Sequence, residues 1–240
     1  MNRLSISGLL LILASCGQHT SRNKIETTTD TLTSNVEGNK LATSRIDEPK
    51  KHETFNESID TIPEVLKSFI PTNYSAINIS TGDANLDGFI DKIIILRENT
   101  EETISNEAED KPAKRPLLLL LGQADNSYKL AIRNENAVLC IDCAGVFGDP
   151  FIGTTIKNGL FSIEHSIAGG HHWEQKTTFK FDKVKGTWIL DQDHVISYKL
   201  NDSKDENAEA LVVDVDKLET VKDFGIITLE QFNIYNDNRK

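Results

Sequence analysis

The sequence predicts a mainly β domain, built as an antiparallel meander or sandwich with one or two short helices, behind a disordered tether. Short apolar runs of strand length recur from residue 59 onwards. Gly, Asn and Asp turn signals separate these runs at close intervals, which favours hairpins over parallel βαβ units. No segment repeats with a period of about 20–50 residues, so a propeller or solenoid is not expected. An α+β fold is the alternative.

The first residues, MNRLSISGLLLILASCGQ, follow the pattern of a secretory signal, with Arg3, an apolar stretch over residues 4–13, and small residues. This stretch is shorter than the about 20 apolar residues of a membrane-spanning helix. Leu13-Ala14-Ser15-Cys16 resembles the bacterial lipobox, which implies removal of residues 1–15 and lipidation of Cys16. We therefore expect an exported protein, lipid-anchored in the cell envelope at the outer membrane, either periplasmic or surface-facing. The alternative is an ordinary signal peptide with an incidental Cys.

Residues 16–58 are predicted to form a lipid-anchored, disordered tether. They are rich in Thr, Ser, Asn and charge, and their few apolar residues are isolated. A single β-rich domain is predicted over residues 59–240. The formal net charge of -11 makes nucleic acid an unexpected partner, because a phosphate backbone repels an acidic chain. The same charge argues against attachment to anionic lipids by electrostatics alone.

The domain is expected to begin with a short helix in SIDTIPEVLKSFIP, because Pro63 suits a first helical turn and Pro71 follows its end. The unbroken run PLLLLL predicts a strand covered on both faces. In FSIEHSI, alternate residues starting at Phe161 and including His165 share one face. Strands are predicted over residues 75–80, 90–97, 116–122, 128–133, 151–157, 160–165, 173–181 and 187–198.

Two acidic segments, residues 98–115 and 201–209, are predicted to be solvated loops because charged and polar residues dominate them. The remaining stretch, LVVDVDKLETVKDFGIITLEQFNIY, is predicted to add a strand and a short helix.

The stretch GDANLDGFID has the residue types and spacing of a calcium loop. Carboxylate and amide oxygens are hard ligands, which favour calcium over zinc or copper. Gly88 at the sixth position permits a sharp bend. The expected ligands, with Phe89 contributing its backbone carbonyl, are Asp83, Asn85, Asp87, Phe89 and Asp91. The alternative is a polar hairpin turn in which Asp and Asn satisfy their own backbone.

An EF-hand requires Glu at position 12 of the loop, where this chain has Ile94, and the flanks read as strands. The loop instead resembles the strand-to-strand calcium loops of FG-GAP and VCBS-type repeats, as in integrin α-chain propellers. The resemblance implies a bound Ca²⁺ as a structural cofactor. It does not imply the propeller, because the chain holds a single such loop.

The three Cys residues leave Cys140 and Cys143 as a pair once Cys16 is lipidated. The C-x-x-C spacing fits a structural disulfide closed across a β-turn. A thioredoxin-like redox pair would need a helix after the first Cys, and AGVFGDPF is poor helix material. Free thiols or a metal site are further alternatives.

Three histidines, His165, His171 and His172, lie close together in EHSIAGGHHWE. A hairpin turning at Gly169-Gly170 would bring His165 near His172, and such a cluster suits zinc or acid–base catalysis. The alternative is a solvated turn. Asp191, Asp193 and His194 in LDQDHV raise the same question. The sequence contains no G-x-S-x-G elbow and no phosphate-binding glycine motif.

A wider resemblance rests on the blocks RPLLLLLGQ, NENAVLCIDCAGVFGDPF, IKNGLFSIEH and TFKFDKVKGTWIL together with the calcium-like loop. These are similar to a family of uncharacterised Gram-negative lipoproteins, over most of residues 71–190. The resemblance implies an envelope location and no particular chemistry. We expect a binding module for a protein or glycan rather than an enzyme. The alternatives are a metal-assisted hydrolase that uses the three histidines, and a C-x-x-C thiol oxidoreductase.

Overall fold

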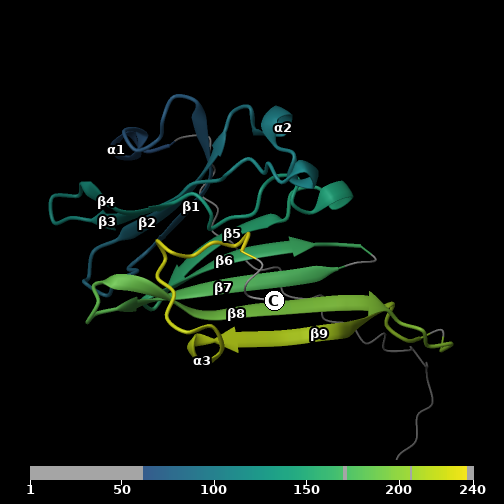
Figure 1. Ribbon diagram of the computed structural model, residues 1–240. Coiled ribbons are helices and arrows are strands. Elements are labelled where there is room, and N and C mark those ends of the chain that lie inside the picture. Colours follow the sequence, from purple (N-terminus) through teal and green to yellow (C-terminus); the bar gives the residue numbers. More distant parts are fainter. Residues whose placement is uncertain (1–61, 170–171, 206, 237–240) are drawn as a thin grey trace, which may run out of the picture. The chain divides into compact units, whose positions relative to one another are not determined.

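The computed structural model describes residues 62–169, 172–205 and 207–236, which form two antiparallel sheets (Figure 1). The prediction of a mainly β, antiparallel fold is confirmed. Cys16, His171 and the predicted tether lie outside the described residues. Among the described residues, no helix has the length and apolar character needed to cross a membrane.

Each sheet is a meander in which neighbours in the chain are neighbours in space. The first sheet contains β1 (Tyr74–Gly82), β2 (Asp91–Glu98), β3 (Leu117–Gly122) and β4 (Tyr128–Asn134). The second contains β5 (Phe151–Lys157), β6 (Leu160–Ile167), β7 (Trp173–Asp182), β8 (Thr187–Leu200) and β9 (Leu211–Thr220). The described helices are short: α1 (Glu64–Lys67), α2 (Glu101–Ile104), η1 (Glu107–Glu109), η2 (Gly145–Phe147) and α3 (Val221–Phe224).

The main core lies between the two sheets. Ile93 and Ile95 on β2 pack with Phe161 and Phe179 from the second sheet, and all four side chains are buried. The intervening Ile94 packs on the other face of the first sheet, under the segment that contains α1. Both faces of β2 and β3 are therefore covered, which explains their continuous apolar runs. Each such side chain contributes about 1.5–3 kcal/mol on burial.

The edge strands β1 and β5 lie against each other and are joined by polar side chains. The Ser80 hydroxyl donates to the Thr154 carbonyl at 2.6 Å, and the Thr154 hydroxyl donates to Asn78 Oδ1 at 2.6 Å. All three residues are buried. Buried polar groups are stable only when they are hydrogen-bonded, so this contact fixes how the two edges meet.

The C-terminal segment closes the other side of the core. The Leu229 amide donates to the Trp188 carbonyl at 2.8 Å, which extends the pairing of β8. The buried side chain of Asn134 donates to the carbonyls of Leu229 and Phe232. The predicted final strand and helix correspond to β9 and α3. Through these hydrogen bonds, the segment after α3 connects β8 to the end of β4.

The prediction that residues 98–115 form a solvated loop is wrong at its ends. Glu101 and Arg115 are each 1% exposed, and Ala113 is also buried. The local composition is acidic and polar, but Glu101 and Arg115 form an ion pair with each other. Arg115 forms a second ion pair with Asp149. A charged residue is buried when such pairing compensates its desolvation.

Candidate functional site

Residues 139–150 form a loop that we call the disulfide loop. Cys140 and Cys143 are joined by a disulfide with their Cα atoms 5.0 Å apart. The Cys143 amide donates to the Cys140 carbonyl at 3.2 Å, which closes a turn. The helix that follows, η2, has three residues and so provides no substantial dipole near Cys140. This arrangement lacks the helix N-terminus that lowers the thiol pKa in thioredoxin-like sites.

The guanidinium of Arg115 ties the disulfide loop to α2. It donates twice to Glu101, with both distances 2.9 Å, and twice to Asp149, with both distances 2.7 Å. It also donates to the Leu139 carbonyl at 3.4 Å. Burial lowers the pKa of Arg115, but the hydrogen bonds to Asp149 and Glu101 outweigh it, and the pKa lies above its ordinary value. Bidentate pairing is the strongest form of such contact.

A second contact joins Asp142 of the disulfide loop to Ser105, which follows α2, and to Glu107, the first residue of η1. The Asp142 carboxylate accepts a hydrogen bond from the Ser105 hydroxyl and another, at 2.9 Å, from the Glu107 amide. Burial alone would raise the pKa of Asp142, but these two donors hold it below its ordinary value. Both ends of the disulfide loop and its central turn are thus fixed.

His165 supports the same loop from the core side of β6. Its Nε2 accepts the Leu139 amide at 3.1 Å, so the ring proton is assigned to Nδ1. Nδ1 is buried and has no hydrogen-bond partner among the described residues. The ring edge meets Phe151, with centroids 5.9 Å apart. Burial lowers the pKa of His165 to about 3, Asp149 opposes this effect, and the imidazole is neutral near pH 7.

This anchored loop carries apolar residues at its surface. Val146 is 96% exposed and Phe147 is 45% exposed. A Cβ placed on Gly169 would lie 3.7 Å from the Phe147 ring, so that ring lies beside the start of the β6–β7 turn. Phe147 of the exposed loop therefore lies beside Gly169, which follows β6.

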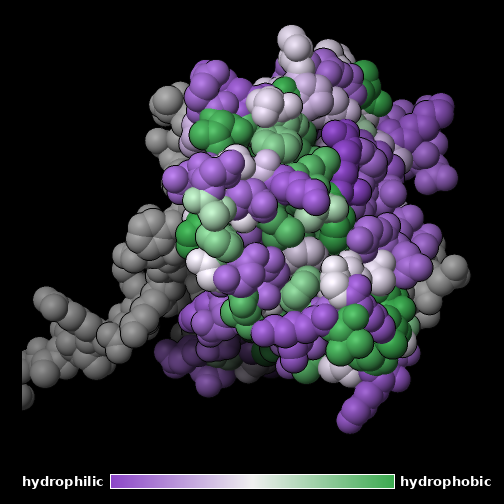
Figure 2. Space-filling view, turned by 90° about the vertical axis from the view of Figure 1, so that its left-hand side faces the viewer, coloured by the Kyte–Doolittle hydropathy of each residue, from purple (hydrophilic) through white to green (hydrophobic). Residues whose placement is uncertain are grey.

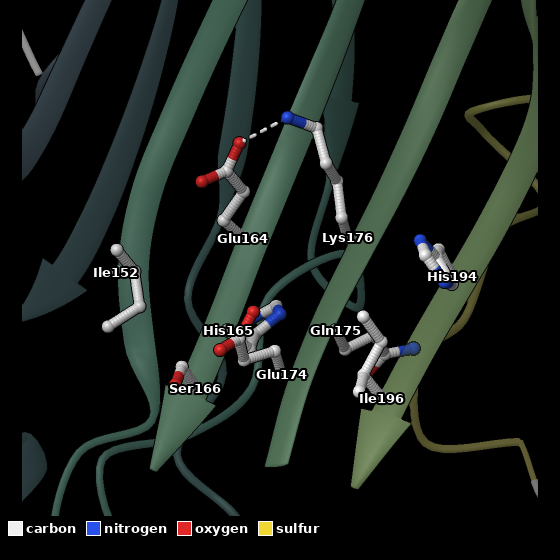
Figure 3. A pocket seen from close by; sticks show the side chains of 9 residues that line it. All are labelled: Ile152, Glu164, His165, Ser166, Glu174, Gln175, Lys176, His194 and Ile196. Carbon is white, nitrogen blue, oxygen red and sulfur yellow. Dashed lines mark ion pairs between the residues drawn. The ribbon is translucent and has the colours of Figure 1, made fainter. Parts of the chain in front are cut away.

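A shallow groove of about 370 Å³ lies across β5 to β8 (Figure 3). The ion pair of Glu164 and Lys176, at 2.7 Å, joins β6 to β7 within its lining. The Ser166 amide donates to the Pro150 carbonyl at 2.8 Å, which joins the groove to the end of the disulfide loop. Its lining residues are Ile152, Glu164, His165, Ser166, Glu174, Gln175, Lys176, His194 and Ile196.

The structure does not bring His165 and His172 together, although His165 and His194 both line the groove. His165 pairs in register with Gln175 and faces the core. His172 contacts Glu174 at 3.0 Å, and Glu174 lies on the opposite face of β7 from Gln175. His194 contacts Asp216 at 2.7 Å on the neighbouring strands.

Of the two aspartates near His194, Asp193 is buried. It accepts hydrogen bonds from Gln175 and Thr177, the latter at 2.8 Å. These contacts orient it within the sheet, and Asp191 belongs to the same strand.

The predicted calcium loop connects β1 to β2 and is held by its own hydrogen bonds. Asp83 accepts the Gly88 amide at 2.9 Å, Asn85 accepts the Asp87 amide at 3.0 Å, and Asp87 accepts the Phe89 amide at 2.8 Å. Leu86 and Gly88 adopt positive φ, as a sharp turn requires. A carboxylate has about four lone-pair sites, so these bonds leave acceptor capacity on each side chain.

Asp91 ends the loop in a fully buried position. It accepts the amides of Ala84 at 2.8 Å and Gly122 at 3.0 Å. Burial raises its pKa, and Asp87 and Asp83 add to this effect. Among the described residues, no three His, Cys, Asp or Glu side chains converge as a metal site. The predicted calcium ligands also include two groups of other kinds, the side-chain amide oxygen of Asn85 and the backbone carbonyl of Phe89.

The acidic loop contacts the second sheet as well as the first. The indole Nε1 of Trp188 donates to the Ala84 carbonyl at 3.0 Å. Leu86 lies against Gly159 in the β5–β6 turn. The loop therefore lies at the end of the domain where β3 turns into β4 and β7 into β8, away from the disulfide loop. Figure 2 looks onto this end, where hydrophobic residues are scattered among hydrophilic ones.

Comparisons with protein-family models, with curated proteins and with solved structures gave no match for this chain. The functional argument therefore rests on the residues themselves. Sequence reasoning missed Arg115 and Glu101, because no local pattern marks a buried ion pair. In the sequence, the exposed surface of the disulfide loop is marked only by Val146-Phe147. These two apolar residues lie within a Gly-rich stretch whose pattern predicts no strand or helix.

Replacing Arg115 with Met is expected to lower the free energy of unfolding by about 3–5 kcal/mol, because Glu101 is left buried with only a longer contact to Arg97, at 3.7 Å. The matched control is Arg133→Met, whose ion pair with Glu135 is half-exposed and is expected to change stability by less than about 1 kcal/mol. Urea unfolding measures both. Equal effects of the two substitutions would contradict a structural role for the Arg115 fork.

His165 is expected to make the fold acid-sensitive. The pKa of His165 in the folded protein, about 3, lies below its ordinary value of 6.5. Its full contribution to folding stability is therefore present above pH 6.5. As the pH falls from 6.5 towards 3, the unfolded chain takes up a proton that the folded chain does not. Stability then declines by up to about 1.4 kcal/mol per pH unit. Urea unfolding at several pH values should show a shallower decline in His165→Phe, and no such change in His194→Phe.

Proposed function

We propose that this protein is an envelope lipoprotein that acts as a binding module, exported and anchored by a lipid on Cys16. The support for the anchor is the sequence pattern of residues 1–16 and the tether-like composition of residues 16–58. The support for binding comes from the described domain. The observation that carries it is the disulfide loop, which displays Val146 and Phe147 on a base fixed by ionic and covalent contacts.

An exposed apolar tip on a rigid loop suits recognition of a protein partner. Exposed large apolar residues contribute most of the binding energy when a partner's pocket covers them. A loop already held in one conformation loses little conformational entropy on association, which strengthens binding. Here Arg115, Asp142, His165 and the disulfide constrain the loop, while Val146 contributes nothing to the core. The groove beside Ile152 extends the surface available to the partner.

The two enzymatic alternatives have less support. A hydrolase would need His165 to take up a proton or bind a metal, yet its Nε2 accepts the Leu139 amide and its pKa is about 3. His172 lies with Glu174 on the other face of the sheet. A thiol oxidoreductase would need a helix after Cys140, and the three-residue η2 does not supply one. We therefore keep binding as the proposed activity.

We also propose that Ca²⁺ is a structural cofactor of the β1–β2 loop, held by oxygens of Asp83, Asn85, Asp87, Phe89 and Asp91. The spacing, the bend at Gly88 and the remaining lone pairs of the carboxylates support this proposal. A cation would offset the repulsion among three nearby carboxylates. Because Trp188 is hydrogen-bonded to Ala84, the ion would also stabilise the contact between the sheets.

Val146→Asp in the mature protein is expected to abolish capture of a stoichiometric partner from detergent-solubilised envelope. A carboxylate placed in an apolar contact loses its water without gaining a partner, and this cost opposes binding. The matched control is Val184→Asp, since Val184 is also 96% exposed but lies in the β7–β8 turn. Quantitative pull-down compares the three proteins. Capture of the same partner by all three, or by none, would contradict recognition through the disulfide loop.

Calcium at about 5 mM is expected to stabilise the protein by about 1–2 kcal/mol over the chelated state, given the about 0.1–1 mM affinity of extracellular sites. Trp173→Phe leaves Trp188 as the sole tryptophan, whose emission should shift on titration because it donates to the loop carbonyl. Asp87→Ala should remove both effects. An unchanged melting midpoint and unchanged emission at millimolar calcium would rule out the cofactor.

A further inference from the structure

The last strand, β9, leaves one long edge of the second sheet open. Each sheet has two outermost strands, β1 and β4 in the first and β5 and β9 in the second. β1 and β5 cover each other, and β4 carries the exposed cations Lys129 and Arg133, which protect a strand edge from pairing. β9 has ten residues, forms the lower edge of its sheet in Figure 1, and pairs with β8 alone among the described strands. Such an edge presents N–H and C=O groups to an incoming strand.

The charges of β9 are compensated within the protein. Every charged residue of the strand contacts an opposite charge on β8 or on β9 itself. The contacts are Asp214 with Lys199 at 2.8 Å, Asp216 with His194 at 2.7 Å, and Lys217 with Glu219 at 2.9 Å. Leu218, between the last two charges, is 53% exposed. The strand therefore combines an open edge with exposed apolar surface and compensated charge.

The order of side chains about Leu218 makes β9 complementary to itself. Side chains alternate between the faces of a strand, so Lys217 and Glu219 share the face opposite to Leu218. Two copies of β9 can pair antiparallel about a two-fold axis that passes beside Leu218, perpendicular to the sheet. Each Lys217 then lies opposite Glu219 of the second copy, and the two Leu218 side chains lie opposite each other. Asp216 lies opposite Thr220, so no like charges meet.

The charges select this register over its neighbours. An axis beside Lys217, Asp216 or Glu219 would place that residue opposite itself, and like charges directly opposite each other are destabilising. An axis between two residues would set side chains of opposite faces against each other. The register shift of β9 against β8 lies at Asp214, outside the five residues 216–220 that pair.

We propose that the protein forms a symmetric dimer through β9, in which residues 216–220 of two copies pair antiparallel and join the two second sheets into one continuous sheet. The interface is isologous, the commonest kind in soluble dimers. It is also small, because α3 begins at Val221 and ends the pairing, and small interfaces give weak, reversible complexes. The dimer goes beyond the proposed binding function: it presents two disulfide loops, so a partner with two sites is held by both.

The test is sedimentation equilibrium of the full mature chain carrying Cys16→Ser, so that no lipid is attached. At about 0.15 M salt, long-range repulsion between two acidic chains is screened. We expect a monomer–dimer equilibrium between about 10 µM and about 1 mM. Lys217→Glu and Glu219→Lys are each expected to weaken dimerisation at least about tenfold, because each places like charges opposite each other twice.

An equimolar mixture of these two variants is expected to dimerise again. Each negative side chain at positions 217 and 219 of the first variant then lies opposite a positive side chain of the second. Recovery in the mixture also shows that both variants fold. The matched control is Lys204→Glu, the same charge change at an exposed residue of the β8–β9 loop, which should dimerise as the unsubstituted chain does.

A chain that stays monomeric up to about 1 mM would overturn the proposal. Either single variant dimerising normally, the control dimerising as poorly as the single variants, or the mixture staying monomeric would overturn it as well.

Leu218→Cys measures the register independently. Directly opposite residues of antiparallel strands have Cα atoms about 4.5–5.5 Å apart, which suits a disulfide. We expect mild oxidation to give a covalent dimer on a non-reducing gel. Asp216→Cys is the matched control, because its two copies lie more than about 12 Å apart along the paired strands. Cross-linking of both variants to the same extent, or of neither, would contradict the register.

Val146→Asp separates the dimer from the proposed recognition surface. It is expected to dimerise normally, because Val146 lies on the disulfide loop and not on β9. Loss of the dimer in this variant would overturn pairing through β9. Loss of partner capture with an intact dimer is the result expected if the two surfaces are separate.

Discussion

The buried guanidinium of Arg115 is the contact on which the proposed recognition surface depends. It joins α2 to the start and the end of the disulfide loop, through Glu101, Leu139 and Asp149. Removing Arg115 would leave Glu101 buried with only the longer contact to Arg97, at 3.7 Å, which is costly because a buried charge needs close pairing. The loop consequently stays in one conformation although its sequence, rich in glycine and poor in apolar core residues, has no local preference for one.

The two ends of the domain have different physical roles. At one end, the acidic loop is hydrogen-bonded to Trp188 and lies against the β5–β6 turn, so it belongs to the packing of the sheets. At the other end, the disulfide loop presents Val146 and Phe147 at the surface. A cation at the first end would act on stability, whereas a partner at the second end would contact exposed side chains of the disulfide loop.

The histidines illustrate how a cluster in sequence differs from a cluster in space. A β-strand alternates its side chains between two faces, so His165 faces the core while the contact of His172 is made on the other side of the sheet. His165 serves as a neutral acceptor for the Leu139 amide, and its desolvation prevents it from taking up a proton near neutral pH. His172 instead meets the ring of Tyr198 edge-on, with centroids 4.7 Å apart.

The sequence by itself determined the class of fold, the eight strands from 75 to 198 within a few residues, and the double covering of PLLLLL, because apolar periodicity and turn residues are local signals. It also singled out Cys140 with Cys143 and the acidic loop, since both rest on short spacings. Only the tertiary structure decided that Glu101, Arg115 and Asp149 meet, and that His165 and His172 do not. Those contacts join residues 14 to 34 positions apart in the Arg115 fork, and no local pattern records which distant charges or rings will come together.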